Sequence, residues 1–287
     1  MLNSIISVLY DGFAFGMLLF VLSVGLSVTL GMMNFVNLAH CAFAMLGGYV
    51  TVTLINLAGW PFLATLPAAF LAAALASVVL ERALYRRFYG KSDLDQCLLT
   101  IGIVFVAVAG AAYVFGTLQQ PIQIPSWLRG AWVVGNLTFG VYRAFLIVTG
   151  VTLAIVLILM LEYTRFGATV RAAVDNQRMA RGLGVDVDRV FMLTFALGSG
   201  LAGLGGSLAI EIVGLDHAFA LTYLIYVLIV VSVGGMGSIW GSFAAASVLG
   251  ISDMAGKYWL PQLGSFLIYL VMVGILMWRP LGLFGKR

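Results

Sequence analysis

Residues 12 to 31 read GFAFGMLLFVLSVGLSVTLG, a stretch of apolar and small residues without a single formal charge. Asp, Glu, Lys and Arg remain absent as far as Leu80, over 69 residues in all. About 20 consecutive apolar residues are enough for a helix to cross the hydrocarbon core of a bilayer. A charge-free run of this length therefore predicts several membrane-spanning helices in succession.

The composition of the whole chain also indicates an integral membrane protein. Of its 287 residues, 62% are hydrophobic and only 9% are charged, and the mean hydropathy is +1.09. Soluble domains carry about 25% charged residues, so this chain could not cover a surface that faces water. Cys41 and Cys97 lie in apolar segments without metal-ligand spacing, which favours neither a disulfide framework nor a zinc site.

Nine apolar segments are candidate spans, and they predict an all-α polytopic bundle that forms a single membrane domain over 1–287. The apolar runs are continuous rather than alternating, which favours helices over a β-barrel. The eighth segment is the weakest, because it contains Asp253 and Lys257, although these two residues can pair at their i,i+4 spacing. Without that segment the count is eight. The candidate segments are 12–31, 39–57, 62–81, 97–117, 144–162, 190–214, 218–235, 241–260 and 264–279.

The basic residues predict the orientation, since Lys and Arg accumulate in the cytoplasmic loops of membrane proteins. If three basic clusters are all cytoplasmic, an even number of spans must separate each pair. This parity requires the eighth segment to cross, and it predicts a periplasmic N-terminus and a cytoplasmic C-terminus. The clusters are Arg82, Arg86, Arg87 and Lys91; Arg165, Arg171, Arg178, Arg181 and Arg189; and Arg279, Lys286 and Arg287.

Small residues four apart predict close contacts between helices, because they let two backbones approach each other in lipid. Gly12 and Gly16 form one such pair, and Gly237 and Gly241 form another. The third candidate span offers a comparable face of alanines. That face consists of Ala68, Ala72 and Ala76.

The sequence holds no catalytic or nucleotide-binding motif in a suitable context. Residues 198–203 read GSGLAG, formally a G-x-G-x-x-G, but they lie inside an apolar segment and lack the βαβ context of a nucleotide site. No G-x-x-x-x-G-K-[ST], H-E-x-x-H or G-x-S-x-G occurs. We therefore expect no catalytic residues, no metal and no cofactor on this chain, and no nucleic-acid partner.

Segment 163–190 is too long for a simple turn. On a helix, Arg171, Asp175 and Arg178 would fall within about 60° of one another, with apolar side chains on the other side. This predicts one amphipathic helix over 170–181. Its charged face is either a docking site for a cytoplasmic partner or an interfacial element on anionic lipid.

Segment 118–143 is the other long connection between candidate spans. It contains Trp127 and Trp132 together with two prolines. Tryptophan is enriched where a protein crosses the membrane–water interface. We expect this segment to be a periplasmic loop with aromatic interface anchors.

Residues 32 to 40, MMNFVNLAH, place Asn34, Asn37 and His40 in otherwise apolar surroundings. If the first helix ends near Gly31, these residues form a break at or near the inner face of the membrane. Asn34 or Asn37 would then cap the second helix, with His40 in its first turn. Alternatively, the break faces the central cavity of a transporter, where irregular backbone and polar groups are tolerated. The two interpretations are compatible, and the second makes these three residues candidates for a translocation pathway.

The chain resembles the LivH-type permease subunit of the branched-chain amino-acid ABC importer family. The matching stretches follow one another in the family's order over nearly the whole chain. They are MNFVNLAHCAFAMLGGYV (33–50), GATVRAAVDNQRMARGLGVDVDRVFMLTFALGSGLAGLGGSLA (167–209), VVSVGGMGSIWGSFAAASVLG (230–250) and WRPLGLFGK (278–286). One departure is Cys41, which stands where many relatives have glycine after the histidine.

The resemblance implies a transport subunit of the bacterial inner membrane that is not itself an enzyme. Its implied partners are a second, LivM-like permease, two cytoplasmic ABC ATPases that bind the ATP, and a periplasmic substrate-binding protein. Segment 167–184 would engage an ATPase, through Arg171, Asp175, Arg178 and Arg181. The cargo would be a small amino acid, most often a branched-chain one, although related systems carry other amino acids, amides, urea or aromatic acids.

Two other classes of function remain as alternatives. A self-sufficient secondary transporter or channel would use an ion gradient, and the few carboxylates inside the spans and the charged loop 163–190 argue against it. An intramembrane aspartyl protease would need two Asp residues on facing helices, and only Asp253 lies convincingly within a span.

Overall fold

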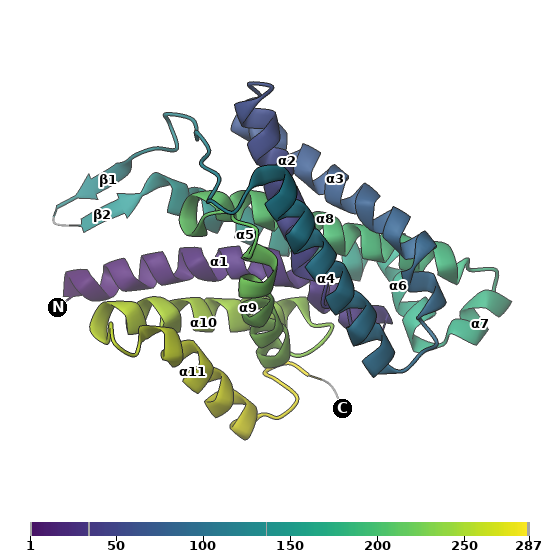
Figure 1. Cartoon of the computed structure of the whole chain (residues 1–287). Helices are drawn as coiled ribbons and strands as arrows, with labels where there is room; N and C mark the ends of the chain where they lie inside the picture. The colour runs from purple at the N-terminus through teal and green to yellow at the C-terminus, as the bar shows by residue number, and fades with distance from the viewer. Residues whose placement is uncertain (1, 34, 136, 286–287) are drawn as a thin grey trace.

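The computed structural model describes residues 2–33, 35–135 and 137–285 and shows a helical bundle with one short β-hairpin (Figure 1). This architecture confirms the predicted all-α class. The elements are α1 (Leu2–Met33), α2 (His40–Asn56), α3 (Phe62–Ala83), the 3₁₀ turn η1 (Tyr85–Arg87), α4 (Asp93–Phe115), β1 (Ala131–Val134), β2 (Leu137–Gly140), α5 (Val141–Tyr163), α6 (Arg165–Asp175), α7 (Gln177–Gly182), α8 (Val187–Val213), α9 (Phe219–Gly234), α10 (Ile239–Trp259) and α11 (Gly264–Trp278).

Each of the nine predicted apolar segments overlaps one helix of the described chain, namely α1 to α5 and α8 to α11, although α1 begins well before its segment, at Leu2. Five of these helices, α1, α3, α4, α5 and α8, are long and apolar enough to cross a membrane by length and composition. Helices α2, α9 and most of α11 are apolar but shorter. Helix α10 has 21 residues and carries Asp253 and Lys257, which form the predicted i,i+4 ion pair at 2.5 Å.

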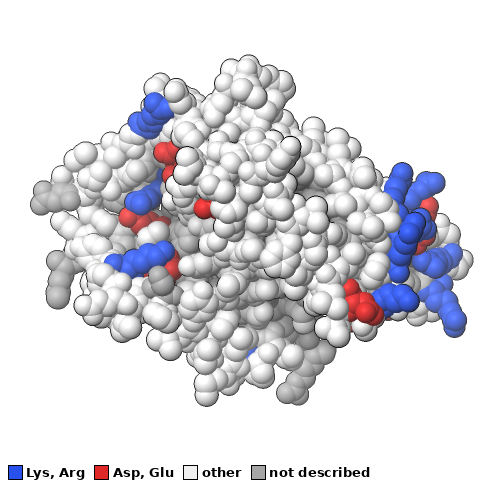
Figure 2. All heavy atoms as spheres, viewed as in Figure 1, with Lys and Arg blue, Asp and Glu red and all other residues white. Residues whose placement is uncertain are grey.

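The helix ends gather at two opposite faces of the bundle. At one face, Arg86 after α3 pairs with Asp188 at the start of α8, and a hollow of about 500 Å³ joins Leu161 near the end of α5 to Ser238 before α10. We call this the arginine-rich face. Charged side chains lie mainly at the two ends of the molecule, with an almost uncharged band between them (Figure 2). The face is defined by Arg82, Arg86, Arg87, Lys91, Arg165, Arg171, Arg178, Arg181 and Arg189.

Hydrogen bonds join the connections at the opposite face. The Asn56 side chain donates to the Pro121 carbonyl at 3.1 Å, which ties the end of α2 to the segment after α4. The Gln120 backbone N–H donates to the Leu215 carbonyl, between α8 and α9, at 2.8 Å. Successive apolar helices therefore run alternately between the two faces, so that the start of α1 and residue 285 lie at opposite faces.

The eighth apolar segment, α10, runs antiparallel to α1 along most of its length. A Cβ added to Gly12 would lie 2.6 Å from the Ile251 Cα, and one added to Gly16 would lie 2.6 Å from the Ala246 carbonyl oxygen. Near the other end of α1, Gly31 packs against Gly237. The predicted small-residue contacts of α1 are thus confirmed, and α10 extends between the two faces as the parity of the basic clusters requires.

The predicted alanine face of α3 is wrong by one position. Ala69 and Ala73 are fully buried and pack against Gly203 of α8, where an added Cβ would meet the Ala73 Cβ at 2.5 Å. Ala68, Ala72 and Ala76 are only half-buried. Both sets share the same spacing of four, and only the position of α8 decides between them.

The long segment between α4 and α5 contains a hairpin that the sequence interpretation missed. Strands β1 and β2 pair antiparallel, with Ala131 opposite Gly140 and Trp132 opposite Phe139. The Tyr10 hydroxyl of α1 donates to the Gly140 carbonyl at 2.8 Å, and Arg143 pairs with Asp11 at 2.5 Å. The hairpin is therefore fastened to the start of α1 at the face opposite the arginines.

Candidate functional site

The connection between α1 and α2, residues 34–39, interrupts the bundle, and we call it the break. Its first residue, the predicted pathway residue Asn34, lies outside the described residues. In the remaining residues of the break, two backbone N–H groups donate to side chains of α4 instead of to other backbone groups. The Val36 N–H donates to the Gln96 side-chain oxygen at 3.0 Å, and the Leu38 N–H donates to the Thr100 hydroxyl at 3.2 Å.

Gln96 also joins the break to the connection before α4. Its side-chain nitrogen donates to the Phe88 and Lys91 carbonyls, each at 3.3 Å. Gln96 and Thr100 are one helical turn apart on the same side of α4, and both are buried. Buried backbone N–H groups need such partners, so these two residues hold the conformation of the break.

The other two predicted pathway residues, Asn37 and His40, are both buried. The Asn37 side-chain oxygen accepts from the Ala39 N–H at 3.1 Å, which makes a local turn before α2. The predicted cap by Asn37 is wrong, because the N-cap position is Ala39, which provides no side-chain hydrogen bond, and the alternative cap by Asn34 lies outside the described residues. His40 is the first residue of α2, as expected.

His40 lies deeper in the bundle than the end of α1. Its Nε2 is 2.9 Å from the Leu22 carbonyl oxygen, and since a carbonyl only accepts, this nitrogen carries the proton. Leu22 lies about 16 Å before Met33 along α1 at the usual rise of a helix. Among the described residues, His40 Nδ1 and Asn37 Nδ2 have no hydrogen-bond partner. The two side chains thus keep unused polar capacity inside the bundle.

The segment 163–190 does not form the single helix that its periodicity predicts. It divides into α6 and α7 at Asn176, which has an extended backbone and whose side-chain oxygen caps α7 by accepting from the Met179 N–H at 3.0 Å. The predicted apolar side is confirmed, since Val170, Ala173 and Ala180 are buried. An asparagine side chain that competes for a backbone N–H explains the division.

The four predicted coupling residues accordingly have different surroundings. The Arg171 guanidinium donates to the Leu161 and Glu162 carbonyls at the end of α5, so it points towards the bundle. Asp175 and Arg178 are exposed on α6 and α7. An ion pair between Arg171 and Asp175 is not among those formed by the described residues. Arg181 pairs with Asp188 at 2.9 Å.

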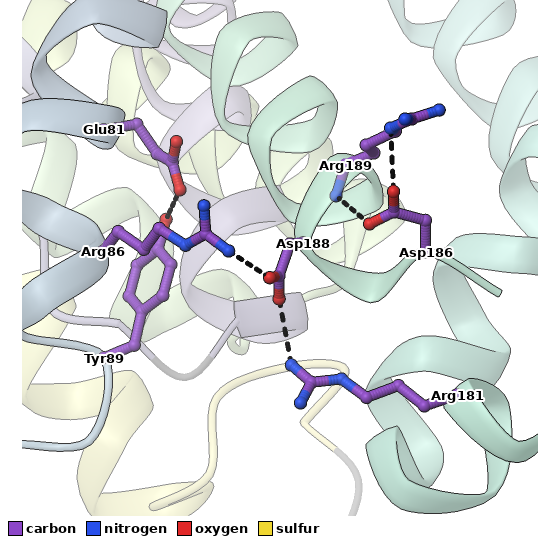
Figure 3. A network of polar contacts seen from close by, with 7 residues as sticks. All are labelled: Glu81, Arg86, Tyr89, Arg181, Asp186, Asp188 and Arg189. Atoms are coloured by element: carbon purple, nitrogen blue, oxygen red, sulfur yellow. Dashed lines mark hydrogen bonds and ion pairs between the residues drawn. The ribbon is translucent and has the colours of Figure 1, made fainter.

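Asp188 lies between two arginines from different elements (Figure 3). It accepts from Arg86 of η1 and from Arg181 of α7, and therefore joins the end of α3, the loop helix α7 and the start of α8. These side chains are about half exposed, at 58% for Arg86 and 47% for Asp188. Exposed ion pairs contribute only about 0–1 kcal/mol to stability, so the arrangement fixes geometry more than it stabilises the fold.

Two further contacts complete this network (Figure 3). Arg189 pairs with Asp186 at 2.7 Å, and the Tyr89 hydroxyl donates to the buried Glu81 carboxylate at 3.1 Å. Burial, followed by the neighbouring Glu81 charge, raises the pKa of Tyr89 above its usual value. A hollow of about 280 Å³ opens beside these groups. Its lining residues are Glu81, Arg82, Arg86, Asp186, Asp188, Arg189 and Met192.

Sequence reasoning missed Gln96, Thr100 and Asp188. The only signal for the first two was an i,i+4 pair of polar residues within an apolar helix. The sequence offered no such signal for Asp188, because its partner Arg86 is 102 positions away along the chain. Within the described residues, no group of three His, Cys, Asp or Glu side chains could hold a metal ion.

The sequence matches the family described as branched-chain amino acid transport system / permease component over residues 8–276. The chain belongs to this family. The arginine-rich face and the break are therefore features of a permease component.

Named permeases from several organisms are similar to this permease component. A probable branched-chain amino acid transport permease protein LivH of Methanocaldococcus jannaschii is 28% identical over 285 residues, covering 93% of this chain and 89% of the relative. The high-affinity LivH permease protein of Escherichia coli is 23% identical over 300 residues, covering 97% and 94%. The LivM permease protein of Salmonella typhimurium is 26% identical over 298 residues, covering 93% and 68%. No solved structure matches the chain.

Proposed function

We propose that this permease component forms part of the pathway by which an ABC importer carries branched-chain amino acids across the bacterial inner membrane. The family match over 8–276 carries this proposal, and the similar LivH and LivM proteins are named for that transport. The chain contains no P-loop sequence, so ATP hydrolysis belongs to partner subunits. Those partners are a second, LivM-like permease, two cytoplasmic ATPases and a periplasmic binding protein.

The arginine-rich face is the cytoplasmic face of this importer. Basic residues favour the cytoplasmic side of a membrane, and the cluster around α6 and α7 is the largest group of arginines in the chain. In this orientation the N-terminus is periplasmic and the C-terminus is cytoplasmic. Exposed Asp175 and Arg178 provide the direct contact with an ATPase, while Arg171 and Arg181 hold the two loop helices against the bundle.

The break and the first residue of α2 form part of the translocation pathway, through Asn34, Asn37 and His40. Support comes from the buried polar atoms of Asn37 and His40 that have no partner among the described residues. Leaving such an atom unpaired costs about 1–3 kcal/mol, a cost that a structural turn alone does not require. A cargo that carries both an ammonium and a carboxylate group can use this hydrogen-bonding capacity when the pathway opens.

The test is purification of the chain with its candidate partners and reconstitution into liposomes. We expect leucine, presented by the binding protein, to stimulate ATP hydrolysis and to enter the liposomes only when ATP is present. The matched control is a complex whose ATPases carry a substitution of the P-loop lysine. Uptake by that control, driven by an ion gradient, would contradict the proposal and favour a secondary transporter.

A further inference from the structure

The η1 turn lies between the charged network and the break, and it contacts both. On one side, Arg86 of η1 pairs with Asp188, which also holds Arg181 of the loop helix α7. On the other side, the aromatic ring of Tyr85 lies 5.4 Å from the ring of Phe35, measured between centroids. Phe35 is the first described residue of the break.

The aromatic contacts on the inner side of η1 are buried. Tyr85 and Phe35 are at most 1% exposed, and Tyr85 also packs edge-on against Phe195 of α8, with ring centroids 5.2 Å apart. Tyr89, just after η1, lies 5.4 Å from the ring of Phe35 as well. Closely packed interiors transmit displacement, since few voids are available to absorb it.

A displacement of Phe35 would reach the rest of the break directly. The next residue, Val36, is held by Gln96, which also binds the Phe88 and Lys91 carbonyls. The aromatic rings and the Gln96 side chain therefore form two parallel attachments between residues 85–91 and the break. Because both attachments lie on one segment, the break and that segment should move together.

We propose that the η1 turn transmits movements of the loop helix α7 to the break. Arg86 and Asp188 are positioning residues in this link: they attach η1 to α7 and α8, and Tyr85 attaches it to Phe35. The inference rests on the proposed function, because it requires an ATPase that moves α7. The half-exposed ion pairs of Asp188 strengthen when a docked ATPase excludes water, since charges attract more strongly at lower dielectric constant.

The native residue Cys41 can report movement of the break through its reactivity towards a thiol reagent. Cys41 directly follows His40 and is fully buried, so a thiol reagent reaches it only when the break or α2 moves. Cys97 is partly exposed and is removed by Cys97→Ala. In reconstituted complexes of this background, we would measure N-ethylmaleimide labelling of Cys41 with and without ATP and leucine, together with leucine transported per ATP hydrolysed.

Three variants remove the ion pair between Arg86 and Asp188. They are Arg86→Gln, Asp188→Asn and the double substitution. Arg87→Gln is the matched control, because Arg87 is exposed and enters none of the ion pairs formed by the described residues. In the parent and the control, ATP should accelerate Cys41 labelling. In the three variants this acceleration should be lost, and transport per ATP should fall roughly 2- to 30-fold, the range of coupling changes along packed networks.

A rescue variant and the double variant distinguish transmission of movement through η1 from a merely structural role of the ion pair between Arg86 and Asp188. Arg86→Lys keeps a charge for Asp188 and should restore both readouts, and the double variant should be no worse than the more affected single variant. All values refer to the amount of purified complex, so a lower yield does not hide the result. Arg86→Gln behaving like Arg87→Gln, or Cys41 not responding to ATP in the parent complex, would overturn this inference. Failure of leucine to stimulate the parent ATPases would instead overturn the proposed function.

Discussion

The two described polar residues at the break combine burial with incomplete hydrogen bonding. His40 uses Nε2 to donate to the Leu22 carbonyl, and Asn37 uses its oxygen to accept from the Ala39 N–H. The remaining nitrogen of each side chain has no partner among the described residues. Leu22 lies inside α1, so its carbonyl also has the intrahelical partner that helix geometry provides. The His40 contact is consequently not essential for forming α1.

We predict that His40→Ala and Asn37→Ala impair transport more than assembly of the complex. The lost hydrogen bonds cost about 0.5–1.5 kcal/mol each, which a large bundle tolerates, whereas loss of a pathway group should slow uptake at least ~10-fold, or about 1.4 kcal/mol in the barrier. Uptake and yield of the complex would be measured together. Cys41→Ala, an equally buried neighbour, is the control. A yield that falls in step with uptake would identify both residues as structural.

At the scale of elements, the spans could be predicted and their connections could not. Lipid leaves a backbone no partner except itself, so each long apolar segment had to be helical wherever its neighbours lay. The division at Asn176, the β-hairpin at 131–140 and the attachment of the break to Gln96 depend on particular side-chain contacts. Asp188 and Arg86 meet only because α3 and α8 pack together. The sequence therefore located the charged segment 163–190 and the break, but it did not predict the geometry of either.

The division of 163–190 into α6 and α7 separates the roles of two arginines. Arg178→Glu should lower the affinity for the ATPases at least ~10-fold, because like charges brought together at an interface cost several kcal/mol. Arg171→Gln should leave ATPase binding intact and destabilise the permease by about 0.3–1 kcal/mol, the usual contribution of a cation at a helix C-terminus. Co-purification of the ATPases and thermal unfolding distinguish the two effects, with Arg178→Lys as the control. Equal ATPase binding by Arg178→Glu and Arg178→Lys would show that α7 does not form the contact.

At the scale of the molecule, the chain uses one arrangement twice in opposite directions. Helix α1 is long and is followed by a break and the shorter α2, and α8 is long and is followed by a turn and the shorter α9. α1 and α8 meet at Gly25 and Gly198, where a Cβ added to either would meet the backbone carbonyl of the other. α1 starts at the face opposite the arginines and α8 starts at the arginine-rich face. The two long helices therefore run in opposite directions and contact each other at these small residues.

Because successive apolar helices run alternately between the two faces of the bundle, the position of each connection relative to the membrane can be predicted. Reporter fusions after residues 58, 90, 130 and 175 and at the C-terminus should be periplasmic, cytoplasmic, periplasmic, cytoplasmic and cytoplasmic if, as we propose, the arginine-rich face is cytoplasmic. Alkaline phosphatase, active in the periplasm, and green fluorescent protein, fluorescent in the cytoplasm, provide complementary signals at each site. The fusion at 175 tests the arginine-rich loop directly, and the C-terminal fusion tests whether α10 crosses, since one span fewer would move that end to the other side. A periplasmic signal at either position would be incompatible with nine alternating helices and with an ATPase bound at α7.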